Sequence, residues 1–205
     1  MIETRFPDHE PRPSTPGGGL TPWTRLSREV VGRFRIFDVV EERFARPGTD
    51  RTHSFLVILA RDWANVVPVT PEGKVVLIRQ FRPGSREVTI EIPGGVIEGD
   101  EADPSAAALR ELEEETGYRA EGIAPLLAVR PNPAIQRNTQ YSFIAWGCRP
   151  TGRTNPDEGE EVAPFEATWD EIDAMIDDGR IDHALILPAL LRARGHAAAH
   201  PGRAQ

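Results

Sequence analysis

The residues with the clearest capacity for chemistry are three glutamates of the segment ELEEE: Glu111, Glu114 and Glu115. At spacings of three and four residues, their side chains would share one face of an α-helix. Like charges placed this way destabilise an isolated helix by roughly 0.2–0.5 kcal/mol per pair, so we expect a cation to neutralise them. A hard divalent cation with oxygen ligands meets that need. Composition alone favours a simpler interpretation, a solvated acidic helix face.

A helix that would position these glutamates is well marked at both ends. Asp103 is a suitable N-cap, Pro104 suits the first helical position, and Gly117 is a natural stop. Leu109 and Leu112 are spaced so that they can point into a core on the opposite face. The pattern therefore predicts one helix with a polar side and an apolar side.

The residues around this helix favour a site over a plain solvated surface. The pair Gly94-Gly95 follows an apolar strand and allows a close backbone approach, with carbonyl oxygens exposed near the helix. Arg110 directly precedes Glu111, and Glu101 lies upstream where it can pair with that arginine. We therefore expect a constructed cluster of charges.

These residues, taken in order, resemble the signature of the Nudix hydrolases. The matching positions are Gly95, Glu101, Arg110-Glu111-Leu112, Glu114-Glu115 and Gly117-Tyr118. The chain departs from the signature once, because eight residues instead of seven separate Glu101 from Arg110. The additional residue falls in the loop before the helix, where insertions are tolerated.

The resemblance extends over roughly residues 55 to 190 by the order of elements and implies an α+β Nudix fold. That fold is a mixed β-sheet sandwiched between helices, here with an N-terminal antiparallel strand extension. It also implies a Mg²⁺ cofactor, and Mn²⁺ accepts the same oxygen ligands. The implied metal ligands are the Gly94 carbonyl, Glu111, Glu115 and, directly or through water, Glu114. Gly95, Glu101, Arg110 and Gly117 would be structural, with Arg110 orienting Glu111 and holding Glu101 by a salt bridge.

Four further stretches resemble the ADP-ribose and nucleotide-sugar pyrophosphatase branch: Leu77–Arg82, Glu91–Gly95, Asn132–Gln136 and Asp157–Glu161. By that likeness Arg82 and Arg79 would bind the diphosphate, and Glu91 would line the site. Glu158, and after it Glu160, would supply the base that activates water. The implied reaction hydrolyses ADP-ribose or a similar nucleoside diphosphate sugar to a nucleoside monophosphate and a sugar phosphate.

Two other functions remain open. The substrate could instead be a modified nucleoside triphosphate, a dinucleoside polyphosphate or a coenzyme. The domain could also be a nucleotide-sugar sensor without catalytic activity. The presence of all three helical glutamates argues against the sensor.

Composition limits the partners. The 205 residues carry a net charge of −8, which argues against general binding of nucleic acid or anionic membranes. Cys148 is the only cysteine, so a disulfide within the chain is excluded and a reducing compartment is expected. The sequence has neither a signal peptide pattern nor an apolar run long enough to span a bilayer, so we expect a cytoplasmic protein.

Four regions are predicted along the chain. Residues 1–22 and 195–205 would be flexible tails, 23–52 an N-terminal strand extension and 53–194 the Nudix domain. In the branch named above such strands often cross to a partner, so we expect a homodimer. Predicted strands include 53–60, 65–69, 75–80, 88–92, 124–129 and 141–146, and predicted helices are 169–178 and 184–194. His183 is expected to cap or pack, and Cys148 to be chemically passive.

Overall fold

The computed structural model describes residues 6, 20–99, 101, 103–152 and 161–199. The chain forms two compact units, Met1–Arg61 with Arg130–Thr139, and Asp62–Val129 with Gln140–Gln205. The strand Thr52–Ala60, which begins at the predicted boundary between 52 and 53, belongs to the first unit. In the described part of the chain, every helix is too short or too polar to cross a bilayer.

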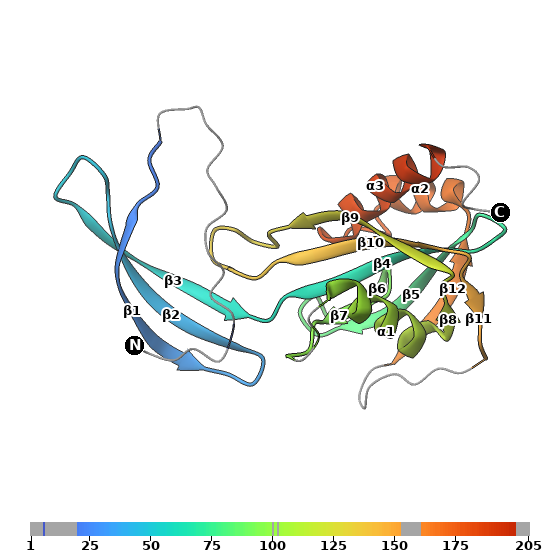
Figure 1. Ribbon diagram of the computed structural model, residues 1–205, viewed down its shortest axis with the longest axis horizontal. Helices are drawn as coiled ribbons and strands as arrows, with labels where there is room; N and C mark the ends of the chain where they lie inside the picture. The colour runs from blue at the N-terminus through green and yellow to red at the C-terminus, as the bar shows by residue number, and fades with distance from the viewer. Residues whose placement is uncertain (1–5, 7–19, 100, 102, 153–160, 200–205) are drawn as a thin grey trace. The chain divides into compact units, whose positions relative to one another are not determined.

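The first unit is a three-stranded antiparallel sheet in the order β1-β2-β3 (Figure 1). Its strands are β1 (Thr24–Arg33), β2 (Phe37–Ala45) and β3 (Thr52–Ala60). They confirm the predicted antiparallel extension, since β3 pairs with β2 along its whole length. Phe6 is buried against Val40 and Leu59 of this unit. Phe6 is thus a packed residue of the predicted 1–22 tail, whose positions 1–5 and 7–19 lie outside the described residues.

A buried carboxylate ties the segment 130–139 to this sheet. Glu42 is fully buried and pairs with Arg25, Arg28 and Arg137. Burial raises the pKa of Glu42, but hydrogen bonds and charges from Arg137 and Arg28 outweigh it and hold the pKa below its ordinary value. A buried charge persists only when it is paired in this way, so Arg137 fixes its segment on the first unit.

The second unit is built on a mixed seven-stranded sheet with the path β12-β5-β4-β10-β9, to which β6 adds beside β5 and β7 beside β4. The strands are β4 (Trp63–Val69), β5 (Val75–Arg82), β6 (Glu87–Glu91), β7 (Gly94–Val96), β9 (Gly122–Val129), β10 (Gln140–Trp146) and β12 (Val162–Ala167). Only β4 and β10 pair in parallel among these. A small separate ladder joins β8 (Tyr118–Arg119) to β11 (Arg149–Pro150).

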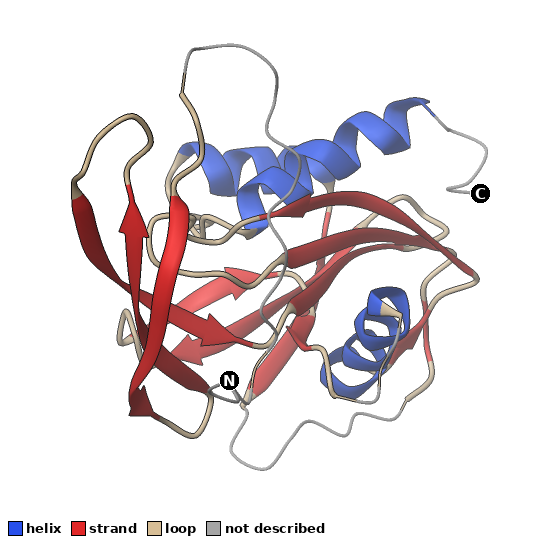
Figure 2. Ribbon diagram, turned by 60° about the vertical axis from the view of Figure 1, so that its left-hand side comes forward, coloured by secondary structure: helices blue, strands red, loops and turns tan. Residues whose placement is uncertain are grey.

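Helices cover both faces of this sheet, as predicted. The helix α1 (Pro104–Thr116) lies on one face, and α2 (Trp169–Asp177) with α3 (Ile186–Ala199) lies on the other (Figures 1 and 2). Strand alternation divides the core accordingly. Ala64 and Val66 of β4 pack with the α1 residues, whereas Val67 and Val69 pack with those of α2 and α3.

The ends of α1 are those that the sequence predicts. Asp103 accepts a hydrogen bond from the Ser105 N–H at 2.9 Å, and Gly117 ends the helix with φ +71°. Leu112 is fully buried, but Leu109 is only half-buried. Ala107 and Ala108 take the positions against the sheet instead, because small side chains let a helix approach closely.

The helix α3 differs from its prediction at both ends. It starts at Ile186, so that Pro188 falls in the first turn, where its missing N–H costs no helical hydrogen bond. It continues to Ala199 and not only to Arg194. The expected flexible segment from 195 is therefore helical through Ala199, since alanines are strong helix formers.

Candidate active site

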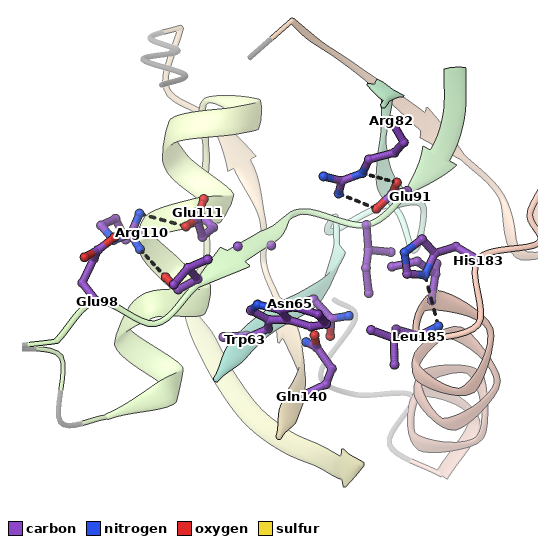
Figure 3. A pocket seen from close by; sticks show the side chains of 16 residues that line it. Trp63, Asn65, Arg82, Glu91, Glu98, Arg110, Glu111, Gln140, His183 and Leu185 are labelled. Carbon is purple, nitrogen blue, oxygen red and sulfur yellow. Dashed lines mark hydrogen bonds and ion pairs between the residues drawn. The ribbon is translucent and has the colours of Figure 1, made fainter. Parts of the chain in front are cut away.

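The second unit contains a pocket of about 480 Å³ beside the first residues of β4 and β10 (Figure 3). Its walls come from β4, β5, β6, β7, β10, α1 and the residues that lead into α3. Strand β7 holds the predicted glycine pair, and α1 holds the predicted glutamates. The fold therefore brings Gly94, Gly95 and Glu111 of the sequence motif to one cavity, whereas Glu114 and Glu115 do not line it.

The two glycines face opposite sides of β7. A Cβ on Gly95 would collide with the carboxylate of Glu111. A Cβ on Gly94 would lie 2.5 Å from the Ala64 carbonyl oxygen and 2.6 Å from the Asn65 Cβ. Glycine is thus required at both positions by close approach, on one side to α1 and on the other to β4.

Arg110 connects the acidic side chains of the motif. Its guanidinium lies 2.9 Å from Glu101, 3.0 Å from Glu111 and 2.7 Å from Glu114. The hydrogen bond with Glu101, then that with Glu114 and the charge of Glu111, raise the pKa of Arg110 despite partial burial. The ion pair predicted between Arg110 and Glu101 is therefore present, and the additional loop residue does not prevent it.

Glu115 has a different partner. It is 3% exposed, and its Oε2 accepts a hydrogen bond from the Gly94 N–H at 2.9 Å. Glu111 and Glu114 are instead held at Arg110. The described residues contain no cluster of three acidic, histidine or cysteine side chains arranged around one point, so the convergence of the three glutamates on one cation stays a prediction. Local charges are compensated by the guanidinium and a backbone N–H.

The donor set nevertheless has the chemistry of a hard divalent cation site. Three carboxylates and the backbone around Gly94 lie within one turn of helix and one short strand. Such oxygen donors suit Mg²⁺ or Mn²⁺. The Glu111 carboxylate lies against Gly95 of β7, so the residues fit the ion that the sequence resemblance implies.

Arg82 and Glu91 form a two-pronged ion pair on another wall of the pocket (Figure 3). Arg82 Nε and Nη2 donate to the two Glu91 oxygens at 2.7 and 2.8 Å, and the Thr89 hydroxyl donates to the same carboxylate. Burial raises the pKa of Glu91, but Arg82 and Thr89 together lower it below its ordinary value. Glu91 therefore stays ionised and fixes the direction of the Arg82 guanidinium.

Arg79 does not line the pocket. It is exposed, and its guanidinium lies 3.9 Å from the ring centroid of Phe165. Residues 79 and 82 of one strand differ by an odd number, so their side chains project to opposite faces. The predicted pairing of Arg79 with Arg82 on one diphosphate is thus not supported by the geometry.

The predicted bases, Glu158 and Glu160, lie outside the described residues. Cys148 is buried, and burial raises the pKa of its thiol to about 12. A thiol with so high a pKa is a poor nucleophile. This burial agrees with the predicted passivity of Cys148.

Several pocket residues were not singled out from the sequence, namely Trp63, Asn65, Gln140 and Leu185. His183, expected to cap or pack, does accept a hydrogen bond at Nδ1 from the Leu185 N–H at 3.1 Å and also lines the pocket. A neutral His183 must therefore carry its proton on Nε2. Asn65 could have been noticed as a polar residue within the apolar strand WANVVPV.

Comparison with known proteins adds the following. A model of the NUDIX domain matches residues 59–190. The chain is 36% identical to the methanol dehydrogenase activator of Bacillus methanolicus over 57% of this chain and 63% of the relative. It is 40% identical to the ADP-ribose pyrophosphatase of Bacillus subtilis, over 39% and 43% respectively. The chain thus spans less than two thirds of the length of both of these relatives.

A match over nearly the full length is the ADP-sugar pyrophosphatase of Mus musculus, 29% identical over 97% of this chain and 94% of the relative. A crystal structure of an ADP compounds hydrolase superposes with a TM-score of 0.80, covering 91% of this chain and all of that chain at 22% identity. At this identity the superposition establishes the fold alone.

Proposed function

The chain belongs to the NUDIX hydrolases, and on this premise we propose that it hydrolyses the diphosphate bond of ADP-ribose or a similar nucleoside diphosphate sugar. The products would be a nucleoside monophosphate and a sugar phosphate. The relatives named as ADP-ribose and ADP-sugar pyrophosphatases support this substrate class. The observation that carries the proposal is the packing of the Glu111 carboxylate against Gly95, with Arg110 joining Glu101, Glu111 and Glu114.

The metal proposed for this site is Mg²⁺ or Mn²⁺, held by Glu111, Glu115, the Gly94 carbonyl and, directly or through water, Glu114. When bound, such an ion offsets the charge of the diphosphate and lowers the pKa of coordinated water. The protein's own contribution is positional. Arg110 holds Glu101, Glu111 and Glu114 in place before any ligand arrives, which lowers the cost of ordering them.

Arg82 would bind the diphosphate oxygens from the opposite wall. Its guanidinium is held by the buried Glu91, and the Arg82 side chain is 38% exposed. A planar guanidinium whose direction is fixed loses little further freedom when it meets a phosphate. Arg82 would therefore orient the substrate across the pocket from α1. Glu158, or in its place Glu160, would accept the proton from the attacking water.

We also propose a homodimer formed through the N-terminal strands. The first unit exposes several large apolar side chains on and next to its strands: Trp23, Leu26, Val31, Phe34, Ile36, Phe55 and Leu56. Trp23 lies 5.4 Å from His53 and 5.9 Å from Phe55 between ring centroids. Apolar surface gathered in this way is typical of an interface.

The proposed function is tested by incubating the full chain with Mg²⁺ and a panel of substrates, and by identifying each product by mass. The panel contains ADP-ribose, other nucleoside diphosphate sugars, modified nucleoside triphosphates, dinucleoside polyphosphates and coenzymes. We expect AMP and ribose 5-phosphate from ADP-ribose. Turnover of only the other classes would refute the proposed substrate, and calorimetric binding without any product would indicate a sensor.

The metal assignment has a separate test. Glu115→Gln removes the charge and keeps the shape of the side chain, so it should lower the rate by orders of magnitude while the thermal unfolding midpoint stays close to that of the wild type. Glu113→Gln, on the same helix but paired with Arg119, is the matched control and should retain activity. A near-normal rate for Glu115→Gln would show that the metal assignment is wrong.

A further inference from the structure

One side of the pocket contains a buried acceptor that the proposed chemistry does not use. Asn65 is 4% exposed and lines the pocket, and its Oδ1 has no hydrogen-bond partner among the described residues. Trp63 precedes it by two residues on the same face of β4. Gln140 stands opposite Trp63 in the parallel pairing of β10 with β4. Figure 3 shows these three side chains together, between the Glu111 and His183 walls.

A buried amide oxygen without a partner is unfavourable in a folded protein, because its hydration is lost without replacement. Such groups are rare in native proteins, and a partner supplied from outside the chain is one explanation for them. Here Asn65 lines a cavity, so a ligand that enters the cavity lies next to its side-chain amide. The group that it lacks is a hydrogen-bond donor, and the indole of Trp63 beside it provides a flat apolar surface.

The position of Asn65 limits which part of a substrate it can meet. Asn65 is paired with Gly94 in the register of β4 and β7, and the two residues are in close contact. Gly95, the next residue, faces Glu111 on the other side. Asn65 is thus the immediate neighbour of Gly94 and Gly95, beside which the diphosphate would bind. In a nucleoside diphosphate sugar, the groups bonded directly to the diphosphate are sugars, whereas the base is one sugar further away.

We propose that Asn65 is a specificity-determining residue whose Oδ1 accepts a hydrogen bond from a hydroxyl of a sugar attached to the diphosphate, with Trp63 packing beside that sugar. This inference rests on the proposed function, since it names the recognition group within the same pocket. Either the nucleoside ribose or the distal sugar supplies the hydroxyl, and the two are separated by experiment.

A competing explanation lies within the protein. Ser142 stands opposite Asn65 on β10, is 1% exposed, and has a hydroxyl without a partner among the described residues. A rotated Ser142 hydroxyl would satisfy Asn65 without any ligand. In that case both Asn65→Leu and Ser142→Ala would lower the unfolding temperature. If Asn65 instead serves a ligand, Asn65→Leu leaves the unfolding temperature unchanged or raises it, because a buried unpaired group is removed.

The test compares the full-length wild type with Asn65→Leu on three substrates: ADP-ribose, its analogue lacking a hydroxyl on the adenosine ribose, and its analogue lacking a hydroxyl on the distal ribose. The wild type should prefer ADP-ribose over one analogue by between about fivefold and a hundredfold in kcat/KM. The affected analogue identifies the sugar that Asn65 contacts. In Asn65→Leu, the ratio of kcat/KM for ADP-ribose to kcat/KM for that analogue should be close to one.

Asn138→Leu is the matched control. Asn138 is 1% exposed with both side-chain polar atoms unpaired among the described residues, but it does not line the pocket. Asn138→Leu should leave the ratio of kcat/KM between ADP-ribose and the affected analogue as it is in the wild type. Asn65→Ala, which cannot clash with Gly94, replaces the leucine variant if the latter does not fold.

The outcomes are separable. A wild type that cleaves ADP-ribose while Asn65→Leu keeps its preference overturns the role of Asn65 and leaves the proposed function standing. Equal losses of unfolding temperature in Asn65→Leu and Ser142→Ala also overturn it, in favour of the internal bond. A wild type that cleaves no nucleoside diphosphate sugar overturns both proposals.

Discussion

The two glycines of β7 should respond differently to the addition of one methyl group. In Gly95→Ala the new Cβ meets the carboxylate of Glu111, which is the end of a flexible side chain. In Gly94→Ala it meets the Ala64 carbonyl oxygen at 2.5 Å and the Asn65 Cα at 2.7 Å, which belong to the backbone of β4. The first substitution therefore displaces a carboxylate, and the second displaces a strand.

The expected magnitudes follow from these contacts. Gly94→Ala overpacks a buried contact, at about 1–3 kcal/mol, which in a chain of this length lowers the unfolding temperature by about 2–12 °C. Gly95→Ala costs the ion pair of Glu111 with Arg110, found at 3.0 Å and partly exposed, worth less than about 1 kcal/mol. Its effect is on the rate, because misplacing a catalytic group by about 1 Å costs about 100-fold.

Both variants are compared with the wild type by calorimetry without metal, and then by ADP-ribose hydrolysis at saturating Mg²⁺. Gly84→Ala is the control, since a Cβ there meets nothing within 4 Å, and it should change neither quantity. A Gly95→Ala enzyme with a near-normal kcat would refute the role of the contact. So would a Gly95→Ala protein that unfolds as early as Gly94→Ala, since the displacement would then not be confined to the side chain.

Three further predictions concern pH, substrate binding and assembly. The pKa of Glu42 is lowered by its arginines, so its stabilisation is present above the unfolded pKa of about 4.3 and is lost as pH falls through the folded value. Glu42→Gln should lower the free energy of unfolding at pH 7 by about 3–5 kcal/mol. It should also weaken the dependence of that free energy on pH, measured by unfolding experiments from pH 3 to 7. Arg82→Lys should raise KM about tenfold with a smaller change in kcat, because a lysine cannot form the two-pronged contact with Glu91; an unchanged KM in steady-state assays would contradict this. Leu26→Asp should halve the mass seen in sedimentation velocity, whereas Leu191→Asp, an exposed leucine of α3, should not; a dimer that persists in Leu26→Asp would count against the N-terminal interface.

Features set by neighbouring residues were predictable. The helix α1 begins at Asp103 and ends at Gly117 because capping depends on a few adjacent positions. The turn between β4 and β5 depends in the same way on the short segment 70–73, and Val69 pairs with Val75 across it. The ion pair between Arg110 and Glu101 also depends on a short stretch of chain. Strand alternation alone already indicates that Arg79 and Arg82 project to opposite faces of β5.

The sequence by itself determined the motif, its helix and the family, because spacing, capping and charge repulsion act between residues close along the chain. Only the tertiary structure decided that Arg137 joins the first unit through Glu42, and that Gln140 stands beside Trp63 through the parallel pairing of β10 with β4. Such neighbours are 95 and 77 positions apart. Their contact depends on chain closure and on the packing of whole elements, which local propensities do not encode.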